Sequence, residues 1–201
     1  MILKVAQVGH PVLRQRSREV TPEELASGAV QQFMDDLLET MDEYDGVGLA
    51  APQVHVPLRI VALQITGERG PEFLVNPRIT VLADTTRKTW EGCLSVEGFR
   101  GLVIRPDHVR IEALDRDGSE KVLEIKGHGA VVVQHECDHL DGVLYIDRAE
   151  PRSLVTTQNF RRYGPPEEYA DEEADVDDEG MDDLDEDELD ELDEDALEEV
   201  G

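Results

Sequence analysis

The feature that most constrains this chain is the segment 134–139, which carries the pattern His-Glu-x-x-His. Four apolar residues precede it and a leucine follows, which favours a helix buried on most sides. On a helix, His135 and His139 lie four residues apart on one face, where two imidazoles can bind one transition metal. Glu136 would stand beside them as a proton carrier. Because only six histidines are present, we favour a metal site on a helix over about 129–141, rather than a buried helix with chance histidines.

A third metal ligand has to come from elsewhere in the chain. Catalytic zinc-type sites keep three protein ligands and leave one position open. The metzincin pattern would place a third histidine at position 145, but that residue is Tyr145. Cys93, which follows Gly92 in the sequence WEGCLS, is the best soft donor. A cysteine considered alone is more often a small buried side chain, but the two-histidine helix favours ligation.

A glycine-containing segment, GVGLAAPQ at residues 46–53, follows an expected helix and precedes an expected strand. Two glycines at this spacing let the backbone approach a ligand or another strand closely. The segment is not a dinucleotide-binding fingerprint, which needs the opposite order of elements and a third glycine where Ala51 stands. Taken alone, it is more typical of a helix end than of a site.

Charge divides the chain into two parts. Of the 47 acidic residues, 22 fall in 164–201, which has no lysine or arginine; residues 1–163 keep 25 acids and 19 bases. We therefore predict one catalytic domain over 1–163 and a disordered acidic tail over 164–201. A solvated tail is favoured over a docking element.

The two cysteines give no disulfide framework, and a thiolate ligand suits a reducing compartment. Without an evident targeting or membrane-spanning segment, we expect a cytoplasmic protein.

The predicted class is α+β, with mainly antiparallel sheets around the buried His-Glu-x-x-His helix and one N-terminal amphipathic helix. That N-terminal helix begins with a capping box at Thr21 and Glu24 and ends at Gly46, and Gly28 is a candidate break in its first turn. The expected helix at 129–141 contains three consecutive valines, which are poor helix formers, so its stability should depend on tertiary packing. A hairpin turn is expected at 115–118. Strands are expected at 58–65, 73–75, 79–82, 87–90, 102–104, 109–114, 122–125 and 143–146.

Three motifs in this order, GVGLAAPQ, EGCLS and QHECDHLDG, resemble the signature motifs of the peptide deformylase family. The resemblance covers about residues 1–160 and extends to GHPVLR near the start and LDRDG before the last strands. It implies a metal-dependent hydrolase that removes the N-formyl group from the initiator methionine of newly made proteins and releases formate. In such a site the metal makes hydroxide available at neutral pH, and Glu136 would carry the proton to the leaving amine.

The resemblance also implies roles for individual residues. The side-chain amide of Gln53 and the backbone N–H of Leu94 would stabilise the oxyanion. The formyl peptide would pair in extended form with Gly46, Val47 and Gly48. The methionine side chain would enter a pocket near Val47, Val131, Val132 and His135. Arg100 matches a position that contacts the substrate chain, although an ordinary surface arginine is equally compatible with the sequence.

The sequence does not decide which metal occupies the site. Sulfur and nitrogen donors suit zinc, whereas the resemblance implies Fe²⁺ in cells, with Zn²⁺, Ni²⁺ or Co²⁺ also able to occupy the site. The expected partners are N-formylmethionyl nascent peptides. The acidic tail would be repelled by ribosomal RNA and attracted to basic ribosomal surface proteins. Neither direct nucleic-acid binding nor membrane association is expected.

Two positions depart from the family pattern or invite a different assignment. Glu97 stands where many family members carry proline, and we expect an altered loop conformation without loss of activity. Cys137 would point about 200° around the helix from His135 and should be packed rather than a ligand. Two rival functions are a zinc endopeptidase, which Tyr145 and EGCLS disfavour, and a non-catalytic metal-binding module, which Glu136 disfavours.

Overall fold

The computed structural model describes residues 1–64 and 71–169 of the chain. The predicted acidic tail therefore lies outside the described residues from position 170 onward. Within the described ranges, no helix is long and apolar enough to cross a membrane.

The described residues form two antiparallel sheets, which confirms the predicted α+β class. Strand order is β1-β2-β3-β6-β7 in the five-stranded sheet and β4-β5-β8 in the three-stranded sheet. The strands are β1 Gly48–Ala50, β2 Ile60–Leu63, β3 Glu72–Val81, β4 Thr86–Glu91, β5 Phe99–Pro106, β6 His108–Leu114, β7 Glu120–Lys126 and β8 Val155–Thr156. The α-helices are α1 Pro22–Leu25, α2 Gly28–Glu43, α3 His128–Leu140 and α4 Thr157–Tyr163. Single 3₁₀ turns lie at Pro11–Arg14, Ala51–Val54, Tyr145–Asp147 and Glu167–Tyr169.

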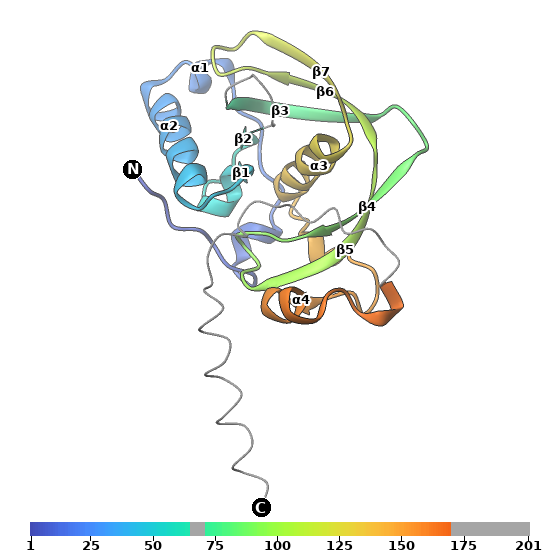
Figure 1. Ribbon diagram of the computed structural model, residues 1–201. Coiled ribbons are helices and arrows are strands. Elements are labelled where there is room, and N and C mark those ends of the chain that lie inside the picture. Colours follow the sequence, from blue (N-terminus) through green and yellow to red (C-terminus); the bar gives the residue numbers. More distant parts are fainter. Residues whose placement is uncertain (65–70, 170–201) are drawn as a thin grey trace, which may run out of the picture.

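Helix α3 lies between the two sheets (Figure 1) and contacts strands of both. Its apolar face packs on the five-stranded sheet in one buried cluster, which contains Ala130, Val133, Cys137 and Leu140 from the helix and Val61, Leu63, Leu74, Val109 and Ile111 from the strands. Burial of this face stabilises the helix despite three consecutive valines, which have low helix propensity. The opposite face, with His135, lines a cavity.

The N-terminal helical region differs from the expected single helix. The capping box is confirmed, since the Thr21 hydroxyl accepts from the Glu24 N–H and the Glu24 carboxylate accepts from the Thr21 N–H. However, α1 ends at Leu25, and the Ser27 hydroxyl caps a second helix by accepting from the N–H of Val30. A second strong N-cap two residues after the end of the first short helix divides the segment in two. Helix α2 then packs on β1 and β2.

Two strand expectations need correction. The segments 73–75 and 79–82 belong to one strand, β3, whose pairing with β6 shifts register between Val75 and Arg78. Asn76, at φ 53°, occupies this irregularity and exchanges two hydrogen bonds of 2.9 Å with the Val20 backbone. The expected strand at 143–146 is wrong: Tyr145–Asp147 is a 3₁₀ turn, because the Asp147 carboxylate accepts from the Leu144 N–H at 2.8 Å and caps it.

The C-terminal part of the described chain packs on the three-stranded sheet. Trp90 of β4 is fully buried against Phe160 of α4, with ring centroids 4.8 Å apart. Tyr169 lies edge-on to Trp90 at 6.3 Å and donates a 2.6 Å hydrogen bond to the Pro151 carbonyl. Neither α4 nor β8 was expected from the sequence. Contacts with the body continue to Tyr169, beyond the predicted domain end at residue 163.

Candidate active site

A cavity of about 620 Å³ lies beside α3 and is bordered by both sheets. It is lined by all but one of the residues singled out from the sequence, namely Gly46, Val47, Gly48, Gln53, Cys93, Leu94, Arg100, Val131, Val132, His135 and Glu136. The exception, His139, is 1% exposed and lies behind Cys93, with 3.3 Å between Cys93 Sγ and His139 Nε2. Residues from five separate segments therefore meet at one place.

Cys93, His135 and His139 bring their ligand atoms together. Each offers one donor atom, and these atoms all lie within 4.8 Å of one another. Cys93 lies two residues after the end of β4, and its sulfur accepts from the Ser95 N–H at 3.4 Å. The set of one sulfur and two imidazole nitrogens suits a divalent transition metal. The residues present therefore fit one metal ion.

The two histidines differ in their surroundings. His135 Nδ1 lies 2.8 Å from a Glu91 oxygen, so its Nε2 remains available to a metal. Burial lowers the pKa of His135, but Cys93 and Glu91 outweigh it and raise that pKa well above the usual value, so metal binding at this ring would release a proton. Burial, with the neighbouring charge of His135, lowers the pKa of His139 well below the usual value. His139 is therefore neutral, which is the form that binds metals.

Glu91 also belongs to a buried ion network that the sequence did not predict. Arg105 of β5 is 3% exposed and binds Glu91 through two nitrogens, at 2.5 and 2.9 Å. Its third nitrogen binds Asp138 of α3 at 2.8 Å, and Arg148 binds the same carboxylate. Burial raises the pKa of Glu91, but its bonds to Arg105 and His135 lower it to about 2. This network fixes β4 and β5 against α3.

Glu136 has the properties of a proton carrier. It is 4% exposed, and Oε2 has no hydrogen-bond partner among the described residues. Burial raises the pKa of Glu136 to about 7, near the pH at which it would work. Gly48 lies directly against it: a Cβ at position 48 would come within 2.7 Å of the Glu136 Cγ and Oε1 atoms. Gly48 is thus required for this carboxylate to keep its place.

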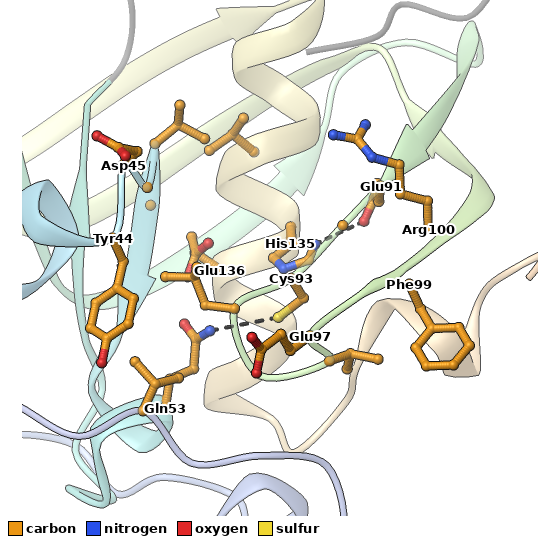
Figure 2. Close-up of a pocket in the computed structure, with 18 of the residues that line it drawn as sticks. Tyr44, Asp45, Gln53, Glu91, Cys93, Glu97, Phe99, Arg100, His135 and Glu136 are labelled. Carbon is orange, nitrogen blue, oxygen red and sulfur yellow. Dashed lines mark hydrogen bonds and ion pairs between the residues drawn. The ribbon is translucent and has the colours of Figure 1, made fainter. Parts of the chain in front are cut away.

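Gln53 lies beside the sulfur of Cys93 (Figure 2), and Leu94, the next residue after Cys93, also lines the cavity. The Gln53 Oε1 atom accepts from the Ala50 N–H at 2.8 Å, which fixes the orientation of the amide. Its Nε2 therefore faces Cys93 Sγ at 3.6 Å and Ser95 Oγ at 3.3 Å. The Leu94 carbonyl accepts from Gln7 at 2.8 Å, which holds the Leu94 peptide beside the cavity.

The remaining predicted residues form the walls and the rim. Strand β1 is the edge strand of its sheet and pairs only with β2 within the described chain. The Val47 carbonyl accepts from the Gln64 N–H, on the side of β2. Figure 2 shows Tyr44 and Asp45 on one side of the pocket and Phe99 and Arg100 on the other. Cys137 lies in the apolar cluster, where burial raises its pKa to about 12.

A thiol, two imidazoles and a buried carboxylate arranged in this way define the site of a metal-dependent hydrolase. The family model for polypeptide deformylase matches residues 2–154. A peptide deformylase of Leptospira biflexa serovar Patoc is 41% identical over 162 residues, which cover 76% of this chain and 90% of the relative.

Solved structures agree with the sequence relatives. Peptide deformylase from Thermotoga maritima has a TM-score of 0.70 at 35% identity, over 75% of this chain and 99% of that one. A class I type b peptide deformylase from Acinetobacter baumannii, bound to Met-Ala-Ser, has a TM-score of 0.70 at 34% identity, over 74% and 98% of the two chains.

This chain belongs to the polypeptide deformylase family. The expected function is thereby confirmed: the protein is a hydrolase that removes the N-formyl group from the initiator methionine of newly made proteins and releases formate.

Proposed function

We propose that deformylation takes place at the Cys93, His135 and His139 cluster, with Glu136 as the proton carrier. One observation carries this proposal: three metal-ligand atoms within 4.8 Å of one another lie beside a buried carboxyl with a pKa of about 7. We further propose Fe²⁺ as the ion in cells, with Zn²⁺, Ni²⁺ and Co²⁺ as alternatives that the same donors can hold. A divalent ion held there would supply Lewis acidity, both toward water and toward the formyl oxygen.

The chain's own residues would handle the protons and the developing charge. Glu136 accepts a proton from the attacking water and delivers it to the leaving amine, which is possible because its pKa lies near neutrality. The Gln53 amide and the Leu94 N–H donate to the oxygen of the former carbonyl as it becomes negative. The fixed orientation of Gln53 means that little reorganisation is needed in the transition state.

The substrate would bind as an added strand along β1. The open edge of β1, and the absence of side chains at Gly46 and Gly48, allow an extended peptide to approach the backbone closely. The methionine side chain would then enter the part of the cavity lined by Val47, Val131 and Val132, and Arg100 would contact the peptide. That the Acinetobacter deformylase has been solved with Met-Ala-Ser bound supports a short peptide as the ligand of this chain.

The Glu136→Gln variant tests this mechanism. It keeps the shape and the metal ligands but removes the proton acceptor, so formate release from formyl-Met-Ala-Ser should fall by about 10²–10⁴-fold. Metal content per chain should stay unchanged. Glu120→Gln, an exposed change on β7, is the matched control and should behave as the wild type.

Wild-type rates in a metal-loaded Glu136→Gln sample would contradict the proposed role. An internal peptide bond, assayed beside the formyl peptide, tests the rival function. Cleavage of that bond without formate release would favour a zinc endopeptidase.

We also propose that the protein works in the cytoplasm, where nascent chains emerge and thiol ligands stay reduced. The surplus negative charge of the tail is suited to contact with basic ribosomal surface proteins, and not with RNA or membranes. Removing residues 170–201 should leave formate release from a short formyl peptide unchanged and weaken co-sedimentation with ribosomes at low salt. Unchanged co-sedimentation would refute this role of the tail.

A further inference from the structure

A threonine in the wall of the same cavity has a buried hydroxyl and has no part in the chemistry described above. Thr89 of β4 lines the cavity and is 1% exposed. Its Oγ1 atom is buried and has no hydrogen-bond partner among the described residues. A buried hydroxyl without a partner is unfavourable. This position therefore calls for a group that can share a hydrogen bond with it.

The direction of Thr89 follows from the alternation of side chains along β4. Trp90 points away from the cavity into the cluster with Leu102 and Phe160. Glu91, two residues after Thr89, points into the cavity and binds His135. Thr89 shares the face of Glu91 and therefore points toward α3.

Its position along α3 is fixed by its neighbours on the strand. Arg87, two residues before Thr89, reaches within 3.9 Å of the Cβ position of Gly127, directly before α3. Glu91 contacts His135, two turns further along the helix. Thr89 lies between them on the strand and lines the cavity together with Val131 and Val132 of α3. That is the part of the cavity into which the methionine side chain is proposed to enter.

A second hydrogen-bond donor lies in the same wall. Arg100 lines the cavity, and its Nη1 atom is buried without a hydrogen-bond partner among the described residues. A guanidinium can only donate. The wall thus offers donors to whatever side chain occupies the cavity, and a thioether sulfur is a weak acceptor.

We propose that Thr89 is a specificity-determining residue, whose hydroxyl allows the methionine pocket to accept oxidised methionine, and that N-formylmethionine sulfoxide peptides are substrates. This inference rests on the proposed binding mode. The sulfoxide oxygen is a polar acceptor, and its burial is favourable only where a donor meets it. The reaction is the same hydrolysis: water and the formyl peptide give formate and the free amine, and the sulfoxide passes through unchanged.

Competition in one tube gives the sharpest test. Formyl-Met-Ala-Ser and its sulfoxide are mixed with metal-loaded enzyme, and the two free-amine products are separated by mass spectrometry. The ratio of products reports the ratio of kcat/KM and does not depend on how much enzyme is active. We expect the wild type to prefer methionine over the sulfoxide by less than about tenfold, and Thr89→Val to raise that preference by about tenfold or more.

Three further measurements separate specificity from folding. Thr89→Ser, which keeps the hydroxyl, should retain the wild-type ratio. Thr86→Val, the same change at an exposed position of β4, should have no effect. A formyl-norleucine peptide, which has no acceptor, should react equally well with the wild type and with Thr89→Val.

An unchanged ratio in Thr89→Val, or an equal loss on all three peptides, would overturn this inference alone. A wild-type preference for methionine over the sulfoxide of a hundredfold or more would also overturn it. Absence of formate release from formyl-Met-Ala-Ser in the wild type would instead overturn the proposed function.

Discussion

The two sheets that enclose α3 contact this helix through different kinds of interaction. The five-stranded sheet meets the helix through apolar side chains such as Leu74, Val109 and Ile111, all fully buried. The three-stranded sheet meets it through ions, since Arg105 joins Glu91 of β4 to Asp138 of the helix. The cavity lies between these two interfaces, and both hold the helix that carries His135 and His139.

Because of this difference, we expect one sheet to stabilise α3 and the other to fix its position. Apolar contacts are non-directional, so the five-stranded sheet can stabilise α3 without fixing its rotation to a few tenths of an ångström. Charge-assisted hydrogen bonds have defined lengths and directions. The ion network can therefore set the distance from Cys93, which follows β4, to the histidines. We expect apolar mutations to change stability only, and mutations in the network to change both stability and metal binding.

The largest effect is expected from Arg105→Met. It leaves the buried Glu91 and the partly buried Asp138 with one partner fewer each and should destabilise the metal-free protein by about 3–5 kcal/mol in urea unfolding. Arg78→Met removes an exposed arginine, 77% accessible and 3.6 Å from Glu19, and should cost less than about 1 kcal/mol. Equal effects of the two changes would show that the buried network contributes no more than a surface ion pair.

Leu74→Ala tests the apolar interface and should cost about 2–5 kcal/mol in the same unfolding experiment. The dissociation constant for Zn²⁺, measured well below the unfolding midpoint, should nevertheless stay within about twofold of the wild type, because the ion network is untouched. A tenfold loss of zinc affinity would refute the division of roles between the two sheets.

Glu91→Gln tests placement with the smallest change in shape. The amide can no longer provide a charged acceptor for His135 Nδ1, and loss of such a partner lowers metal affinity by about 10–100-fold. Glu124→Gln, an exposed change on β7, is the control. The double variant Arg105→Met with Glu91→Gln should be more stable than Arg105→Met alone, but its affinity for Zn²⁺ should stay as low as that of Glu91→Gln. A double variant that regains both stability and zinc affinity would indicate that Glu91 only offsets the charge of Arg105.

Much of this arrangement could be predicted from the sequence, because local patterns encode it. The capping box at Thr21 and the class of antiparallel sheet depend on residues close together in the chain. The cluster of Cys93, His135 and His139 was predicted from the soft donor in EGCLS and the His-x-x-x-His spacing, and its donor atoms do lie together.

Other features depend on tertiary contacts and have no local signal. Arg105 is one of several charged residues in β strands, and only the fold places it between Glu91 and Asp138. Thr89 resembles any strand threonine until its unpaired hydroxyl is seen in the cavity wall. The segment 143–146 has the composition of a strand, but the Asp147 side chain competes for the Leu144 N–H and stabilises a turn there.

Sulfur ligation by Cys93 is the central claim, and X-ray absorption at the zinc edge of Zn²⁺-loaded protein tests it directly. We predict one sulfur neighbour at about 2.3 Å, with nitrogen and oxygen neighbours at about 2.0–2.2 Å. The sulfur signal should disappear in Cys93→Ser and persist in Cys137→Ser, because Cys137 lies in the apolar cluster. A spectrum of the wild type with only nitrogen and oxygen neighbours, or a sulfur signal that survives Cys93→Ser, would contradict the account.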